Sequence, residues 1–281
     1  MRGMKMNRVV LSAVALAALA APAMAADIPM KAPKVAEPVY VSPWDVAFGG
    51  AFASDYVLRG ISQSDREPSV SAYIEPRFNI NPNLQLYAGL AGFSLHTGFA
   101  DAEYDVYGGI RPTFGAFAFD FGFTYYFYPG LNPLLVPIGE DNGDYGEVYG
   151  KVAWTVADWL TLGLNGIYSN NFGNFGDSYY WVSGTAKVTL PWTLPMGIGS
   201  YVSGEIGYQG YDNTVALAFA TDTTFWNAGI GFTYKAFTLD LRYHDTDLSP
   251  RDCFFLVGGR NYCDEAFVAK LSFDTTLAAL K

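Results

Sequence analysis

Hydrophobic and polar positions alternate along residues 117–128, which read FAFDFGFTYYFY. Every odd position from 117 to 127 is aromatic, whereas the even positions include Ala118, Asp120, Gly122 and Thr124. A period of two predicts a β-strand with one apolar face and one face that tolerates a carboxylate. The apolar face must contact either a protein core or lipid, and the rest of the chain decides between these two environments.

The same alternation predicts twelve strands, most of them near the roughly 9–11 residues that a tilted membrane-spanning strand needs. The predicted strands are 44–53, 70–80, 84–94, 103–111, 117–128, 145–155, 160–169, 179–190, 201–209, 225–235, 237–245 and 266–274.

The connections between these strands alternate in length. The short ones are 81–83, 112–116, 156–159, 236 and the somewhat longer 191–199, and the long polar ones are 54–69, 95–102, 129–144, 170–178, 210–224 and 246–265. An even number of strands, with tight turns at one end and long loops at the other, is typical of outer-membrane barrels whose termini lie in the periplasm. We therefore expect an all-β fold, a transmembrane antiparallel up-and-down β-barrel of about 12 strands over residues 44–281.

The faces of the predicted strands differ in polarity. Along 237–245, Phe237, Leu239 and Leu241 share one face, and Asp240 and Arg242 lie on the other. Ionisable side chains that face lipid cost roughly 2–4 kcal/mol each near the midplane, so the polar faces should line the barrel interior. The predicted pore-lining residues are Glu75, Arg77, Glu103, Asp105, Arg111, Asp120, Glu147, Lys151, Glu205, Asp240, Arg242 and His244, together with Lys187, Lys235 and Lys270.

Two interpretations of this charged interior remain open. One is a narrow water-filled channel that passes small polar solutes or ions. The other is an interior in which the charges pair and partly fill the space, because about twelve strands lie between filled eight-stranded barrels and open porins.

Composition agrees with a membrane barrel. Charged residues make up only 16% of the chain, whereas about a quarter is usual for a soluble domain. The 17 basic residues against 27 acidic ones leave no basic stripe for phosphates, so no nucleic-acid partner is expected.

The N-terminal segment predicts export. Arg2, Lys5 and Arg8 precede an apolar run and the small-residue pattern 23–25, so residues 1–25 are expected to be a signal peptide cut before Ala26. An uncleaved anchor is disfavoured because the apolar run is too short to span a bilayer as a helix. Residues 26–43 are rich in proline and predict an extended periplasmic linker.

Little in the sequence favours catalysis. His96 and His244 are the two histidines, so a Ser-His-acid hydrolase would have to use one of them. For His244, a structural hydrogen bond on the interior wall is the simpler role. No zinc spacing, phosphate loop or dinucleotide motif is present, and neither a metal nor a cofactor is expected.

Cys253 and Cys263 both fall in the last long loop, and export would place them in an oxidising compartment. A disulfide between them is therefore expected, worth up to roughly 3 kcal/mol through restriction of the unfolded chain.

Acidic residues gather in the predicted outer loops, at Glu140, Asp141, Asp144, Asp247, Asp252, Asp264 and Glu265. Together with the interior carboxylates they would raise the local cation concentration and disfavour anions. Divalent ions could bridge these loops to neighbouring lipopolysaccharide. The alternative is that they only keep the surface solvated.

Four stretches of the chain resemble the TorF family of bacterial porins. They are Ser54–Gln63 (SDYVLRGISQ) followed by Asp65 and Pro68, then 125–129, then 146–150, and Asp240 with 243–246 ahead of the cysteine pair. The resemblance covers almost everything after the linker. It implies an outer-membrane β-barrel of a Gram-negative bacterium that passes small solutes passively and is inserted by the barrel assembly machinery. Barrels of this kind usually end on an aromatic residue, whereas this chain continues past Phe273 to Lys281.

Within the first stretch, Asp55, Arg59 and Gly60 form a rim motif. We expect Asp55 and Arg59 to pair and fold the first loop inward, with Gly60 permitting the sharp bend. Loop anchoring is the favoured role of this motif over direct solute contact.

The sequence therefore predicts an outer-membrane porin for small polar solutes or ions, with a mild preference for cations. The alternatives are a non-conducting structural or adhesive barrel and, third, an outer-membrane hydrolase.

Overall fold

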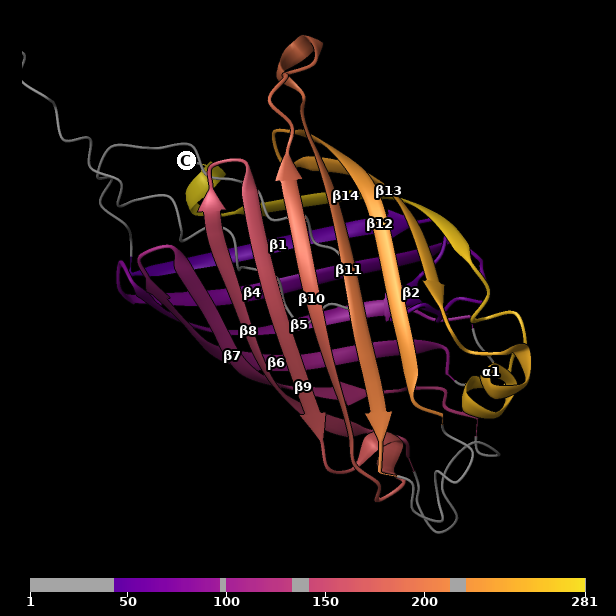
Figure 1. The fold of residues 1–281 in the computed structure, drawn as a ribbon. Coiled ribbons are helices and arrows are strands. Elements are labelled where there is room, and N and C mark those ends of the chain that lie inside the picture. The colour runs from indigo at the N-terminus through magenta and orange to yellow at the C-terminus, as the bar shows by residue number, and fades with distance from the viewer. Residues whose placement is uncertain (1–42, 97–99, 133–141, 213–220, 281) are drawn as a thin grey trace, which may run out of the picture.

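The computed structural model describes residues 43–96, 100–132, 142–212 and 221–280. Within these ranges twelve long antiparallel strands form a closed barrel, in which each strand pairs with its neighbours in the chain and β1 pairs with β14 (Figure 1). The predicted fold class is confirmed. The strands are β1 (Trp44–Ala53), β4 (Ser69–Asn81), β5 (Leu84–Ser94), β6 (Ala102–Phe114), β7 (Phe117–Phe127), β8 (Tyr145–Ala157), β9 (Leu160–Ser169), β10 (Tyr179–Thr189), β11 (Gly199–Tyr211), β12 (Thr223–Tyr234), β13 (Phe237–Thr246) and β14 (Ala266–Thr276).

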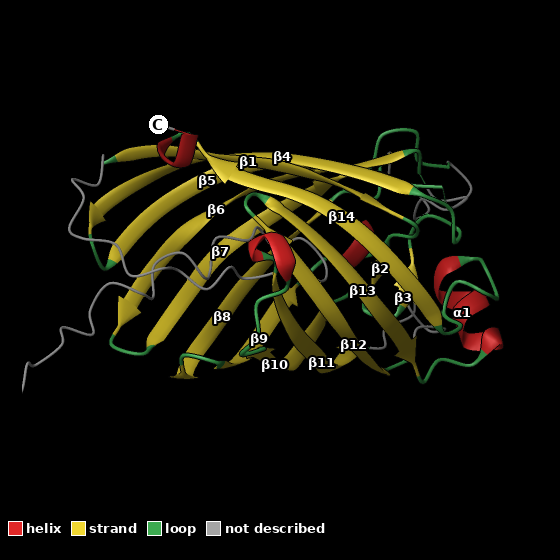
Figure 2. Cartoon of the chain, turned by 90° about the horizontal axis from the view of Figure 1, so that it is seen from above, coloured by secondary structure: helices red, strands yellow, loops and turns green. Residues whose placement is uncertain are grey.

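The two ends of the barrel differ as the connection lengths predict. Short turns and the C-terminal 3-10 helix η3 (Ala278–Leu280) lie at one end, called here the short-turn end, while helix α1 (Pro250–Val257) lies at the opposite, long-loop end (Figures 1 and 2). The two further 3-10 helices are η1 (Phe172–Asn174) and η2 (Pro195–Gly197).

Exposure alternates along the strands, so the barrel has an apolar outside and a polar inside. On β7, Phe121 and Phe123 are 46% and 47% exposed, whereas Asp120 just before them and Thr124 just after them are 1% exposed. The same alternation holds on β13, where Leu239 and Leu241 face outward. None of the helices in the described part of the chain is long and apolar enough to cross a membrane.

One predicted interior residue lies elsewhere. Lys235 was expected on the inner face, but β12 ends at Tyr234 and Lys235 is exposed in the two-residue turn before Phe237. Lys235 has a φ of +54°, which is a turn conformation, so its side chain does not continue the alternation of β12.

Two of the long loops contain secondary structure that was not predicted. The first loop, residues 54–68 (loop 1), contains a small ribbon of β2 (Val57–Leu58) and β3 (Ile61–Ser62). The last, residues 247–265 (loop 6), contains α1, which begins after Ser249 and ends before Gly258.

The predicted disulfide is present, joining Cys253 in α1 to Cys263 with Cα atoms 5.9 Å apart. The predicted signal peptide, almost all of the linker, and Glu140 and Asp141 lie outside the described residues.

Candidate pore interior

The inner wall contains many tyrosines besides the predicted charges. The ring of Tyr107 on β6 lies where a Cβ on Gly89 of β5 would be, and Tyr201 on β11 covers Gly231 of β12 in the same way. Glycine on the neighbouring strand therefore gives each inward ring room to lie flat against the wall. These tyrosines were not predicted to face the interior, although they alternate in step with the charged residues, as in 145–151 with Tyr145, Glu147 and Tyr149.

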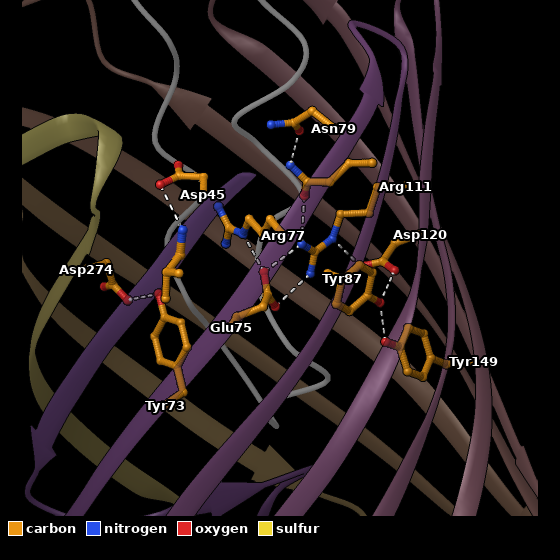
Figure 3. A network of polar contacts seen from close by, with 12 residues as sticks. Asp45, Tyr73, Glu75, Arg77, Asn79, Tyr87, Arg111, Asp120, Tyr149 and Asp274 are labelled. Atoms are coloured by element: carbon orange, nitrogen blue, oxygen red, sulfur yellow. Dashed lines mark hydrogen bonds and ion pairs between the residues drawn. The ribbon is translucent and has the colours of Figure 1, made fainter. Parts of the chain in front are cut away.

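A first network, called here the Glu75 network, joins inward-facing side chains of β4, β5, β6 and β7 (Figure 3). The Glu75 carboxylate, which is 0% exposed, accepts from Arg77 Nε at 2.6 Å and from Arg111 Nη1 and Nη2 at 2.7 and 3.1 Å. Arg111 Nε donates to Asp120 Oδ2 at 3.2 Å, and the Arg111 guanidinium lies 3.5 Å from the centre of the Tyr87 ring. The Tyr87 hydroxyl donates to Asp120.

The Glu75 network therefore ties β4, β5, β6 and β7 together through side chains as well as through the sheet. Buried ion pairs of this kind are weak evidence of net stability, but loss of one partner leaves a buried charge uncompensated and costs about 3–5 kcal/mol. Four of the predicted interior residues meet here, and they are paired with one another.

A second network lies on β11, β12 and β13. Arg242 Nε and Nη2 donate to the two oxygens of Asp240 at 3.0 and 3.1 Å, and Nη1 donates to Asn227 Oδ1 at 2.7 Å. Tyr201 Oη donates to Asp240 Oδ2 at 2.7 Å. Asn227 Nδ2 also donates to Glu205 Oε2 at 3.2 Å, so Glu205 faces the same side.

The remaining interior residues lie near these networks. Lys151 Nζ is 5.0 Å from the centre of the Tyr149 ring, and Lys187 Nζ is 4.2 Å from that of Tyr201. His244 is 5% exposed on β13, whereas His96 is exposed in the loop after β5.

Part of the interior is open. A cavity of about 70 Å³ lies between β1, β4, β13, β14 and loop 1. The acidic and basic residues of its lining are Asp55, Asp240, Arg242, His244, Lys270 and Asp274. A cavity of this size has room for a few water molecules, and the lining offers the polar partners that such water needs. The interior is thus ion-paired in one part and holds a cavity in another.

Toward the long-loop end, three buried carboxylates form what we call the acidic cluster: Glu103, Asp105 and Glu147. Tyr56 Oη donates to Glu103 Oε1 at 3.0 Å, and Tyr126 Oη donates to Glu147 Oε2 at 2.7 Å. Asp105 Oδ1 and Glu147 Oε1 have no hydrogen-bond partner among the residues that the structure describes. In the same ranges no group of three or more His, Cys, Asp or Glu side chains is arranged to hold a metal ion.

Loop 1 folds into the barrel above this cluster, as the rim motif predicts, but through different contacts. The expected Asp55–Arg59 ion pair is not formed in the described loop: Asp55 Oδ1 accepts from Ser62 Oγ and Ser64 Oγ at 2.7 and 2.9 Å. The β2–β3 ribbon separates the two side chains, because four extended residues span roughly 13 Å. Burial raises the pKa of the Asp55 carboxyl, and the two serine hydroxyls partly offset that rise.

Arg59 occupies the tip of the ribbon and reaches across the barrel. Its Nη2 is 3.6 Å from Glu147 Oε1 on β8, and its Nη1 donates to Gln209 Oε1 on β11 at 3.2 Å. Burial disfavours the charge on Arg59, but Glu147 and nearby tyrosines more than offset this, and the pKa of the guanidinium lies above its ordinary value.

A family model described as "Bacterial protein of unknown function (Gcw_chp)" matches residues 37–274, which include the whole barrel except its last few residues. The chain belongs to the Gcw_chp family. The name TorF is not among these findings, so the resemblance to those porins stays a hypothesis. No curated protein matches this Gcw_chp chain.

Solved structures similar to this Gcw_chp protein are outer-membrane proteins. The COG4313 outer membrane channel from Pseudomonas putida F1 is 12% identical with a TM-score of 0.47, over 87% of this chain and 100% of that one. LpxR from Salmonella typhimurium is 10% identical with a TM-score of 0.44, over 81% and 99% of the two chains. OmpT, an outer membrane protein of Vibrio cholerae, is 10% identical with a TM-score of 0.33, over 85% and 100%. These likenesses concern the fold alone.

Proposed function

We propose that this Gcw_chp protein is an outer-membrane channel that passes small polar solutes and ions by passive diffusion, with a mild preference for cations. The observation that carries the proposal is a closed barrel whose outer face is apolar and whose inner face is charged and encloses a cavity with charged side chains in its lining. A wall of this kind separates lipid from a path for water-soluble molecules.

The same barrel wall supports a location in the outer membrane. An exposed belt of Phe, Leu, Ile and Val side chains around closed strands suits lipid, because closure leaves no unpaired sheet edge. The expected signal peptide would bring the chain to the periplasm of a Gram-negative bacterium for insertion by the barrel assembly machinery. Lipopolysaccharide is the proposed neighbour of the acidic outer loops.

The cation preference rests on the balance of charge inside. Carboxylates and basic groups are about equal in number among the predicted pore-lining residues, but three of the carboxylates gather at the acidic cluster near the long-loop end. The cations of the Glu75 network are already neutralised by carboxylates. Uncompensated negative charge in a narrow path attracts cations and repels anions.

One observation favours a second candidate, a non-conducting structural barrel. The ion pairs of the Glu75 network and the inserted Arg59 both narrow the interior in this conformation. On this view the interior charges would serve strand assembly alone.

Conductance of the purified protein in planar lipid bilayers separates the two candidates. We expect small, discrete channel steps, and reversal potentials in a KCl gradient that show a majority of cation current. Absence of steps while a known porin conducts in the same bilayers would exclude transport and leave the structural barrel. Channel steps carried mainly by chloride would remove the cation preference alone.

A further inference from the structure

The pocket that holds Arg59 is built from three strands of the barrel wall, β8, β10 and β11. The Arg59 guanidinium lies 4.8 Å from the centre of the Trp181 ring and 5.6 Å from that of Tyr179. Nη1 donates to Tyr179 Oη at 3.3 Å and to Gln209 Oε1 at 3.2 Å, and Nη2 lies 3.6 Å from Glu147. Aromatic faces with a carboxylate beside them are a common recognition site for organic cations.

The hydrogen bonds of Arg59 in this pocket are long, and some of the buried polar atoms there have none. Hydrogen bonds between charged groups are commonly about 2.7–2.9 Å long, so its contacts are long. Nε of Arg59 itself and two buried atoms of the pocket, Glu147 Oε1 and Trp181 Nε1, have no hydrogen-bond partner in the ranges that the structure describes. Glu147 is 1% and Trp181 8% exposed, so bulk water does not satisfy these atoms. The pocket therefore has one acceptor, Glu147 Oε1, that Arg59 approaches as an ion-pair partner but does not hydrogen-bond.

The occupant is also held by a strained turn. Arg59 and Gly60 are the two central residues of the β2–β3 hairpin, with φ values of +52° and +78°. Glycine adopts this conformation freely, whereas a long side chain such as arginine does so at a cost of about 1–2 kcal/mol. The ribbon keeps Arg59 in place through contacts elsewhere, including Ser62 N to Tyr262 O at 2.7 Å.

We propose that the pocket formed by Glu147, Tyr179, Trp181 and Gln209 is a binding site for organic cations of the guanidinium type, and that Arg59 is a tethered occupant of that site. A solute cation binds when the tip of loop 1 withdraws. Gln209 Oε1, Tyr179 Oη and Glu147 then accept from its N–H groups, and Trp181 covers one face of its plane. The site would lie on the permeation path, so this inference rests on the proposed channel function.

The substitution Arg59→Asn tests the proposal without disturbing the ribbon. Asn-Gly is the preferred central pair of this hairpin turn, so the variant keeps the turn and removes only the guanidinium. Arg260→Asn is the matched control, because Arg260 is exposed in loop 6 and its replacement removes the same charge at the same end of the barrel. Methylguanidinium is the probe, and urea is the neutral planar control.

Binding and conduction are measured separately on the folded, full-length protein. Equilibrium dialysis should show methylguanidinium bound to Arg59→Asn and at least about tenfold more weakly to wild type, to Arg260→Asn and to the double variant Arg59→Asn/Glu147→Gln. In bilayers, Arg59→Asn should conduct more than wild type, and methylguanidinium should block it while urea does not.

Each outcome decides one claim. Equal binding of methylguanidinium by Arg59→Asn and wild type, or binding that does not change with Glu147→Gln, overturns the cation site even where channels are seen. Binding that depends on Glu147, without conductance by either protein, keeps the site and overturns the channel. Block by urea as strong as that by methylguanidinium also argues against a cation site.

Discussion

At the residue scale, the interior depends on pairs of an aromatic ring and a glycine on adjacent strands. The Tyr201 ring lies against Gly231, its hydroxyl donates to Asp240, and Lys187 lies above it. A methyl group on Gly231 would overlap the ring, so the ring and its hydrogen bond would both have to move.

We therefore expect Gly231→Ala to destabilise the barrel by about 1–3 kcal/mol, the usual range for overpacking. Gly184→Ala is the control, because a Cβ at Gly184 meets nothing within 4 Å, and it should change stability by less than about 0.5 kcal/mol. Equilibrium urea unfolding in lipid vesicles measures both. Equal stabilities of the two variants would show that the Tyr201 ring yields without cost.

The sequence predicts single residues well where alternation continues. Asp120 and Arg242 lie inside the barrel as expected, because their neighbours in the strand are apolar. Tyrosine suits either lipid headgroups or a polar interior, so its residue type alone did not indicate that Tyr107 and Tyr201 face inward. The partner of Arg59 was wrongly predicted, because a contact between loop 1 and β8 depends on how the loop folds in three dimensions.

At the element scale, the strands were predictable and the loop elements less so. Helix α1 has usable signals: Ser249 Oγ accepts from Asp252 N, Pro250 is its first residue, and Gly258 ends it in the left-handed conformation. The β2–β3 hairpin lacks such a signal, because arginine is rare in a two-residue turn where φ is positive at both positions.

Loop 1 should respond to pH through Asp55. Its pKa is raised by burial in the docked loop, so docking favours the protonated carboxyl and disfavours the carboxylate. The stabilisation is fully present below the ordinary value near 4 and is lost as pH rises through the raised pKa. Hydrogen exchange of loop 1, corrected for the intrinsic rate at each pH, should therefore show stronger protection in acid.

Asp55→Asn should remove this pH dependence, because the amide cannot titrate and keeps an oxygen that accepts from Ser62 and Ser64. Protection that rises with pH in the unsubstituted protein would contradict this account.

At the scale of the whole molecule, lipid around the apolar belt is the condition on which the proposed function depends. Phe121 lies near the middle of β7, and Phe114 lies at the short-turn end of β6; both are exposed on the outer face. An arginine at the bilayer midplane costs about 2–4 kcal/mol, and one near the interface about 0–1 kcal/mol.

Phe121→Arg should therefore lower the free energy of unfolding in vesicles by about 2–4 kcal/mol, and Phe114→Arg by no more than about 1 kcal/mol. Denaturant titration of both variants measures the difference. Similar small losses at the two positions would mean that this belt does not cross the hydrocarbon.

Loop 6 holds loop 1 through hydrogen bonds from Arg66 to its main chain. The Arg66 guanidinium donates to the backbone carbonyl oxygens of Asn261, Asp264 and Glu265, at 2.8, 2.7 and 3.2 Å, while the side chains of those three residues are exposed. Main-chain oxygens are the same in every amino acid. The side chains at the long-loop end can therefore be replaced without releasing the segment that is folded into the barrel beneath them.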